Sequence, residues 1–165
     1  MDDHTSYAQM VAALVKPGRD IIDSLTPAKA DLLHMVIGVT GEVAELLAST
    51  DMDNTIEEIG DIFFYMERIY QLTGVPRRNI ETATHKFIIA GDLLDAVKKH
   101  VIYGKSLDES AVEVLLGKLN YKLDLTIASI GSTREAIIAG NMAKLTIRYG
   151  KKYSNEAAIN RADKG

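Results

Sequence analysis

Two pairs of acidic residues with the same spacing lie in the middle of the chain. Glu42 and Glu45 are three residues apart, and Glu58 and Asp61 repeat this spacing after a short polar break. Residues three apart share one helix face, so each pair points in one direction. If the two helices pack antiparallel, four carboxylates meet, and acids this close repel one another unless a cation compensates them. The spacing therefore predicts a divalent-metal site.

Two consecutive helices must position these acids. Thr26 followed by Pro27 predicts a helix start, and an apolar stripe with helical periodicity continues to about Ser49. After a short turn, Asn54 with Glu57 three residues later fits a capping pattern and opens the second helix. Such a short connection makes the two helices antiparallel neighbours. Glu57 is expected to point away from the other acids, as a first-turn acid favoured by the helix dipole.

Two glycines interrupt the first of these helices. Gly38 and Gly41 each cost roughly 1 kcal/mol relative to alanine in a helix interior. Their presence predicts that a neighbour or a ligand approaches the helix closely at these positions.

The remaining helices follow from periodicity and capping signals. A short first helix ends at Pro17, and a third helix is predicted from about Arg77 to Ile102. Capping boxes that begin at Ser106 and Ser132 predict helices that reach Gly131 and about Tyr149, with a polar tail behind Gly150. The predicted fold is all-α, with an antiparallel four-helix core and further helices at both ends, in a single domain over residues 1–165.

Composition excludes several classes of function. The 165 residues have a net charge of −4, which argues against a basic surface for polymeric nucleic acid. No cysteine occurs, so disulfides and thiolate metal sites are excluded, as expected for a reducing cytoplasm. No apolar run approaches the roughly 18 residues of a membrane span. We therefore expect a cytoplasmic protein with no membrane partner.

The sequence contains a weak internal repeat. Residues 40–45 resemble residues 90–95, residues 59–66 resemble residues 116–123, and Gly74 parallels Gly131. A duplicated two-helix unit, about 26–74 and about 77–131, would form the four-helix core, with a C-terminal helix at about 133–149. Leu115 and Lys118 replace the second acid pair, so one acidic site per chain follows. Asp92 and Asp95 are then expected to have a structural role.

These residues resemble the all-α nucleoside triphosphate pyrophosphatases, which include MazG-type enzymes and dimeric dUTPases. Glu42, Glu45, Glu58 and Asp61 fill the family's Glu-x-x-Glu and Glu-x-x-Asp pattern in order. Further similar segments are residues 90–108, residues 141–149 with Asn-x-x-Lys-Leu and Arg-Tyr, and Tyr153-Ser154, so that the resemblance extends from about Leu25 to Ser154. The Tyr-Gly-Lys segment at 103–105 departs from the pattern, because it usually lies between the acid pairs. The position of the substrate base therefore stays open.

The resemblance implies hydrolysis of a nucleoside triphosphate to the monophosphate and pyrophosphate. Mg²⁺, for which Mn²⁺ substitutes, would be held by the four acids, one of which could instead act as the base for the attacking water. If a phage encodes the chain, its expected location is the host cytoplasm. Lys144 and Arg148, four residues apart on one helix face, are the expected ligands of the polyphosphate. Asn141 could bond sugar or phosphate, and Tyr149 could line the pocket. Taken alone, each of these charged residues is more often simply part of a solvated surface.

Several alternatives stay open. The substrate could be dUTP, dCTP or a purine such as dGTP. The MazZ branch, which resembles this family and removes guanine nucleotides, is the candidate that corresponds to dGTP. A ferritin-like di-iron bundle is disfavoured because no Glu-x-x-His occurs. A catalytically inactive helical interaction protein is the stronger rival. A homo-oligomer, dimer or tetramer, is expected, with Ile88, Ile89, Ile102 and Ile147 available for its interface.

Overall fold

The computed structural model describes residues 6–164, and the regular structure within this range is helical throughout. Its elements are α1 (Tyr7–Leu14), α2 (Gly18–Ser24), α3 (Pro27–Ala48), α4 (Met52–Thr73), α5 (Lys86–Tyr103), α6 (Glu109–Ser129), α7 (Arg134–Tyr149), α8 (Asn155–Asn160) and the 3₁₀ turn η1 (Ala162–Lys164). The all-α prediction is confirmed. Among the described residues, none of the helices has the length and apolarity needed to cross a membrane.

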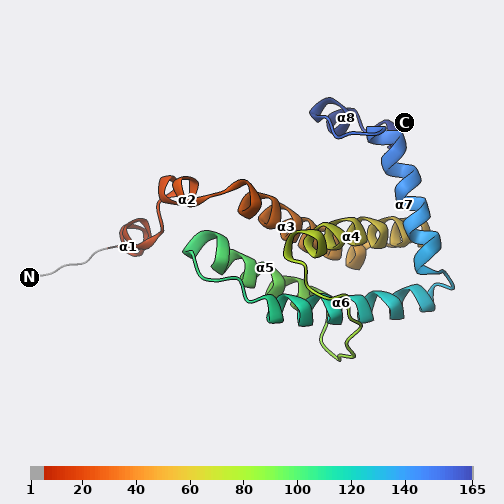
Figure 1. Cartoon of the computed structure of the whole chain (residues 1–165), viewed down its shortest axis with the longest axis horizontal. Helices are drawn as coiled ribbons and strands as arrows, with labels where there is room; N and C mark the ends of the chain where they lie inside the picture. Colours follow the sequence, from red (N-terminus) through yellow and green to blue (C-terminus); the bar gives the residue numbers. More distant parts are fainter. Residues whose placement is uncertain (1–5, 165) are drawn as a thin grey trace, which may run out of the picture.

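Helices α3, α4, α5 and α6 form the core (Figure 1). Helix α3 packs against α4 and α5, and α6 packs against α5 and α4. Arg68 near the end of α4 pairs with Asp31 near the start of α3, so these two helices are antiparallel. Helix α7 packs across α4 and carries α8 and η1, whereas α1 and α2 extend from the opposite end of the molecule (Figure 1). The acid-bearing helices are therefore central.

The α3–α4 hairpin is fixed by a cap on each helix. The Thr26 hydroxyl accepts a hydrogen bond from the Lys29 amide at 3.3 Å, as the sequence predicts. Helix α4 begins earlier than predicted, because the Asp51 carboxylate accepts from the amide of Asn54 at 2.8 Å. Asn54 thus lies inside the first turn and is not the cap. The earlier start leaves only residues 49–51 between the two helices.

The predicted third helix is wrong over its first part, because residues 74–85 are irregular and α5 begins at Lys86. Both α4 and α5 are antiparallel to α3, so this segment must carry the chain back before α5 can start. It lies along α6, where the Ile80 amide donates to the Gly117 carbonyl at 3.0 Å. Gly117 leaves room for this contact, since a Cβ there would lie 2.8 Å from the Ile80 side chain.

Two predicted caps are displaced by one or two residues. Asp108 caps α6 by accepting from Ala111, and Thr133 caps α7 by accepting from Ala136, in place of Ser106 and Ser132. In both segments several adjacent residues can act as caps, and the sequence pattern selects the earliest one. Helix α2, which Pro17 precedes, is absent from the sequence prediction.

The segment behind Gly150, predicted to be a polar tail with at most one loose turn, contains the helix α8 and the turn η1. Helix α8 and η1 turn back onto α7 (Figure 1). The Arg148 guanidinium donates to the Asp163 carboxylate through Nε at 2.5 Å and also through Nη2. The two side chains are only 13% and 2% exposed. A buried ion pair therefore fastens the tail.

Corresponding glycines of the proposed repeat have corresponding roles. Gly74 and Gly131 follow α4 and α6 with φ angles of +69° and +67°, which a residue with a Cβ rarely adopts. Gly60 and Gly117 each lie inside a helix, and the missing Cβ lets a side chain from another segment pack closely against that helix. The two hairpins thus use glycine in the same way at matched positions.

The isoleucines expected at an oligomer interface divide into two groups. Ile88 and Ile147 are 55% and 63% exposed, whereas Ile89 is fully buried in the core. Ile102 is half-buried and packs on the core. Ile89 is thus excluded from a surface role.

Candidate functional site

Three of the four predicted acids converge across the α3–α4 contact. Glu42 on α3 and Glu58 and Asp61 on α4 each offer a carboxylate oxygen, and these oxygens all lie within 4.8 Å of one another. Glu58 is only 7% exposed, and Glu42 and Asp61 are half-buried. The antiparallel hairpin therefore brings together residues 16 to 19 positions apart in the sequence.

Glu45 has a different position from the other three acids. Its side chain is exposed and is not part of the group of converging oxygens. It still lines the same cavity, and its charge contributes to raising the pKa values of Glu42 and Glu58. Glu45 thus borders the site.

The converging acids hold protons more tightly than isolated carboxyl groups. Burial, a hydrogen bond to Glu58 and the charges of Asp61 and Glu45 raise the pKa of Glu42 to about 8. Burial also raises the pKa of Glu58, while its hydrogen bond with Glu42 acts in the opposite direction. With a pKa of about 8, Glu42 is protonated at neutral pH and is hydrogen-bonded to Glu58.

Asp61 is paired with residues from α7. The Lys144 ammonium lies 2.5 Å from one Asp61 oxygen and 2.6 Å from the other. The Asn141 amide donates to Asp61 at 2.7 Å. Lys144 also lies 3.3 Å from Glu57, which lines the cavity; the prediction that Glu57 points elsewhere is therefore wrong. Asn141 and Lys144, predicted to bind substrate, here contact an acid.

A glycine allows α7 to approach the acids. A Cβ at Gly60 would lie 3.0 Å from the Cβ of Asn141, which is closer than most side-chain contacts. Gly60 precedes Asp61 directly, so α7 docks beside the carboxylate. The resulting hydrogen bond from Asn141 to Asp61 joins residues 80 positions apart, and no spacing signal in the sequence predicts it.

The acids open into a large cavity between α3, α4, α7 and the tail, here called the acidic cavity. Its volume is 880 Å³, and it is lined by residues that include all four predicted acids, Tyr65, Arg148, Tyr149, Lys151, Lys152 and Arg161. The sequence does not predict a role for the exposed Lys151, Lys152 and Arg161, because they lie in a segment expected to be a polar tail. Carboxylates at one side and cations from the tail therefore face one space.

The predicted residues Arg148 and Tyr149 also line this cavity. The Arg148 guanidinium is already paired with the Asp163 carboxylate. This pairing raises the pKa of Arg148 above its ordinary value and lowers the pKa of Asp163 to about 2. Tyr149 stacks with Tyr153, with 5.5 Å between ring centroids. Both residues thus connect the cavity wall to the folded tail.

Tyr65 is a site residue that helical spacing could identify, since it lies one turn after Asp61. Its ring lies on α3 at Gly38, where a Cβ would be 2.4 Å from the ring. His34 meets the same ring edge-on at 6.1 Å. Burial, followed by the charges of Glu42 and Asp61, raises the pKa of Tyr65. The predicted close approach is therefore found at Gly38, but not at Gly41, which has no neighbour within 4 Å.

Two other segments lie outside the site. Asp95 forms surface ion pairs with Lys98 at 3.1 Å and Lys99 at 2.6 Å. The Tyr-Gly-Lys segment ends α5, where Gly104 has a φ angle of +69°. Neither segment lines the acidic cavity.

Comparison with protein-family models, with curated proteins and with solved structures finds no match for this chain.

Proposed function

We propose that this chain hydrolyses a nucleoside or deoxynucleoside triphosphate between the α- and β-phosphates, giving the monophosphate and pyrophosphate. The main support for this proposal is that carboxylate oxygens of Glu42, Glu58 and Asp61 lie within 4.8 Å of one another. They border a cavity that is also lined by the cationic side chains of the tail. The resemblance to MazG-type pyrophosphatases supports the same reaction, and its cellular setting is proposed to be the cytoplasm.

The chemistry of the acids fits a divalent cation. Lys144 compensates Asp61 and Glu57, whereas the raised pKa values of Glu42 and Glu58 leave a proton between them that a divalent cation can displace. Glu42, Glu58 and Asp61 would hold Mg²⁺ or Mn²⁺, with Glu45 able to join from the rim. When bound, the cation neutralises phosphate charge and lowers the pKa of a coordinated water.

The other cavity residues suit the polyphosphate and its sugar. Lys151 and Lys152 are exposed cations facing the same space as the acids, and Arg148 joins them if Asp163 releases its fork. Phosphoryl transfer requires mainly positioning and positive charge, which these residues supply. Tyr65 and Tyr149 would line the space beside the phosphates.

A homo-oligomer is part of the proposal. The apolar side chains Ile88 and Ile147, more than half exposed, are available for contacts between copies. Light scattering on the purified chain measures the oligomeric state.

The test is product analysis by anion-exchange chromatography. The purified chain is incubated with each common dNTP and NTP, with Mg²⁺ or Mn²⁺. We expect monophosphate and pyrophosphate from at least one nucleotide, and a loss of about 100-fold or more in Glu42→Gln, since even indirect support of a metal ligand contributes 10- to 100-fold. Glu81→Gln, which neutralises an exposed acid outside the acidic cavity, should retain activity.

Calorimetric titration with Mn²⁺ separates the two rival functions. If the chain is an enzyme for a different nucleotide, it will not turn over the common nucleotides, but the wild type will still bind Mn²⁺. The Glu42→Gln variant will then not bind Mn²⁺. An inactive helical interaction protein would show neither turnover nor Mn²⁺ binding that depends on Glu42. The second result would contradict the proposal.

A further inference from the structure

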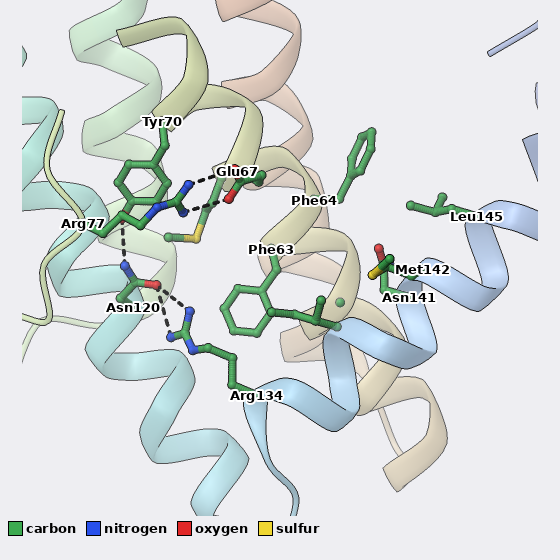
Figure 2. Close-up of a pocket in the computed structure, with 13 residues that line it drawn as sticks. Phe63, Phe64, Glu67, Tyr70, Arg77, Asn120, Arg134, Asn141, Met142 and Leu145 are labelled. Carbon is green, nitrogen blue, oxygen red and sulfur yellow. Dashed lines mark hydrogen bonds and ion pairs between the residues drawn. The ribbon is translucent and has the colours of Figure 1, made fainter. Parts of the chain in front are cut away.

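A second cavity lies between α4, α6 and α7, here called the aromatic cavity (Figure 2). Its volume is 390 Å³, within the range of about 300–1,000 Å³ that small-molecule sites occupy. It shares Phe64, Met142 and Leu145 with the acidic cavity, but none of the converging acids lines it. A ligand here would need no metal.

The walls of the aromatic cavity consist of rings backed by guanidinium groups. Phe63, Phe64 and Tyr70 all come from α4. The Arg134 guanidinium lies 4.3 Å from the centroid of Phe63, and that of Arg77 lies 4.5 Å from the centroid of Tyr70 (Figure 2). Flat faces and N–H edges therefore border the same space.

A buried amide fixes these walls. Asn120 is 7% exposed; its amide donates to the Tyr70 hydroxyl at 2.8 Å, and its carbonyl oxygen accepts from both terminal nitrogens of Arg134 at 3.2 Å (Figure 2). Because both ends of the amide are engaged, the ring of Tyr70 and the fork of Arg134 are held in place. The cavity is thus built before any ligand arrives.

The charges around the aromatic cavity are already paired. Arg77 lies 2.8 Å from Glu67, and Arg134 lies 2.6 Å from Asp124. A charged ligand is therefore not required. An aliphatic ligand would displace water from Glu67 and Arg77 but could not form the hydrogen bonds that this water makes with them. Each group left without a hydrogen bond costs about 1–3 kcal/mol.

We propose that the aromatic cavity binds the nucleobase of an uncharged nucleoside. The exposed Phe64 ring, and the guanidinium planes of Arg77 and Arg134 that cover the buried rings of Tyr70 and Phe63, contact the flat faces of the base. The Glu67 carboxylate accepts hydrogen bonds from the base edge and the Arg77 guanidinium donates to it. The site lies outside the acidic cavity and does not depend on the proposed hydrolysis.

The experiment measures binding of adenosine, guanosine, cytidine and uridine by saturation-transfer NMR with the full chain in EDTA. Ile138→Trp, which fills the cavity from its partly exposed α7 wall, should weaken binding at least about 10-fold. Ala139→Trp is the matched control, because Ala139 is exposed on the same helix and lines neither cavity. Binding of at least one nucleoside to the wild type and to this control, but not to Ile138→Trp, is expected.

A second variant guards against a folding defect. Glu67→Gln at an exposed position keeps the shape of the side chain and should weaken binding about 5- to 10-fold through the lost charged acceptor. Absence of binding for all four nucleosides, or equal binding to wild type and Ile138→Trp, would overturn the proposal. Because EDTA removes divalent cations, neither outcome depends on the hydrolytic site.

A competition arm identifies the source of the base. Titration of the nucleoside complex with the α,β-methylene analogue of the matching triphosphate and Mg²⁺ shows whether the base of the triphosphate enters the same cavity. Displacement supports a base that extends from a nucleotide in the acidic cavity. Simultaneous binding supports a separate nucleoside site.

Discussion

Glu42 and Glu58 share a proton across the contact between α3 and α4. In the unfolded chain the Glu42 carboxyl would ionise near its ordinary pKa of 4.5, whereas in the folded chain this value is raised to about 8. The folded state therefore takes up a proton between these two pH values. Stability linked to this group is full below pH 4.5 and falls as the pH rises towards 8.

Replacing Glu42 by glutamine should remove this dependence. We expect Glu42→Gln to unfold at a higher temperature than the wild type in EDTA, with a difference that grows between pH 5 and 8. Because Glu42 is half-exposed and water screens its charge, we expect about 1–2 kcal/mol at pH 8, or roughly 2–8 °C in Tm. Differential scanning calorimetry over this pH range measures the difference.

Saturating Mg²⁺ provides the contrast for this measurement. It should raise the Tm of the wild type at pH 8 and leave that of Glu42→Gln nearly unchanged. A Tm difference that stays constant from pH 5 to 8 would show that Glu42 does not titrate in this window.

Helical spacing alone predicts which acids meet, because Glu42, Glu58 and Asp61 lie on two helices joined by a short turn. It does not predict their partner. Lys144 reaches Asp61 across 83 positions, and only the packing of α7 against Gly60 brings the two together. The same is true of the tail cations, whose segment carries little periodicity. Residue types indicate what chemistry a side chain can do, but distant contacts decide which group it faces.

The glycines of α3 allow a test of the packing of a whole helix. Gly38→Ala would place a Cβ 2.4 Å from the Tyr65 ring, whereas Gly41→Ala meets no atom within 4 Å. Overpacking costs about 1–3 kcal/mol, and alanine regains about 1 kcal/mol of helix propensity. We expect Gly38→Ala to destabilise the chain by about 1–2 kcal/mol and Gly41→Ala to stabilise it by up to about 1 kcal/mol, as measured by urea unfolding. Equal changes in the two variants would contradict the contact with Tyr65.

Helix ends and the connection between the two hairpins were the parts of the fold that local signals predicted least well. Residues 77–85 contain apolar side chains at compatible spacing, yet they are irregular because the chain must return along α6 before α5 begins. Pro76 and the packing of Ile80 on Gly117 stabilise this course. Direction in a bundle is a property of the assembled helices, and a local pattern carries no information about it.

At the scale of the whole molecule, a buried ion pair joins the end of the tail to α7. Asp163→Asn removes the carboxylate that holds the Arg148 fork. We expect backbone amides in residues 155–164 to exchange at least about 10-fold faster, with α3 to α6 unchanged, because the tail packs on α7 and not on the core. Hydrogen exchange with mass spectrometry resolves these segments.

Glu156→Gln is the matched control for this measurement, since it neutralises an exposed acid on α8. Its exchange pattern should equal that of the wild type. Unchanged exchange of the tail in Asp163→Asn would show that contacts other than the ion pair hold it.

The separation between the acids and Lys144 also sets an order of events during synthesis. The α3–α4 hairpin contains Glu42, Glu58 and Asp61 and is complete at Thr73, whereas Lys144 is translated about 70 residues later. Local hairpins form in microseconds to milliseconds, while a ribosome adds about 5–20 residues per second. For several seconds the nascent hairpin therefore carries its acids without their ammonium partner. Bound protons, or cations from the surrounding solution, must compensate the acids until α7 arrives.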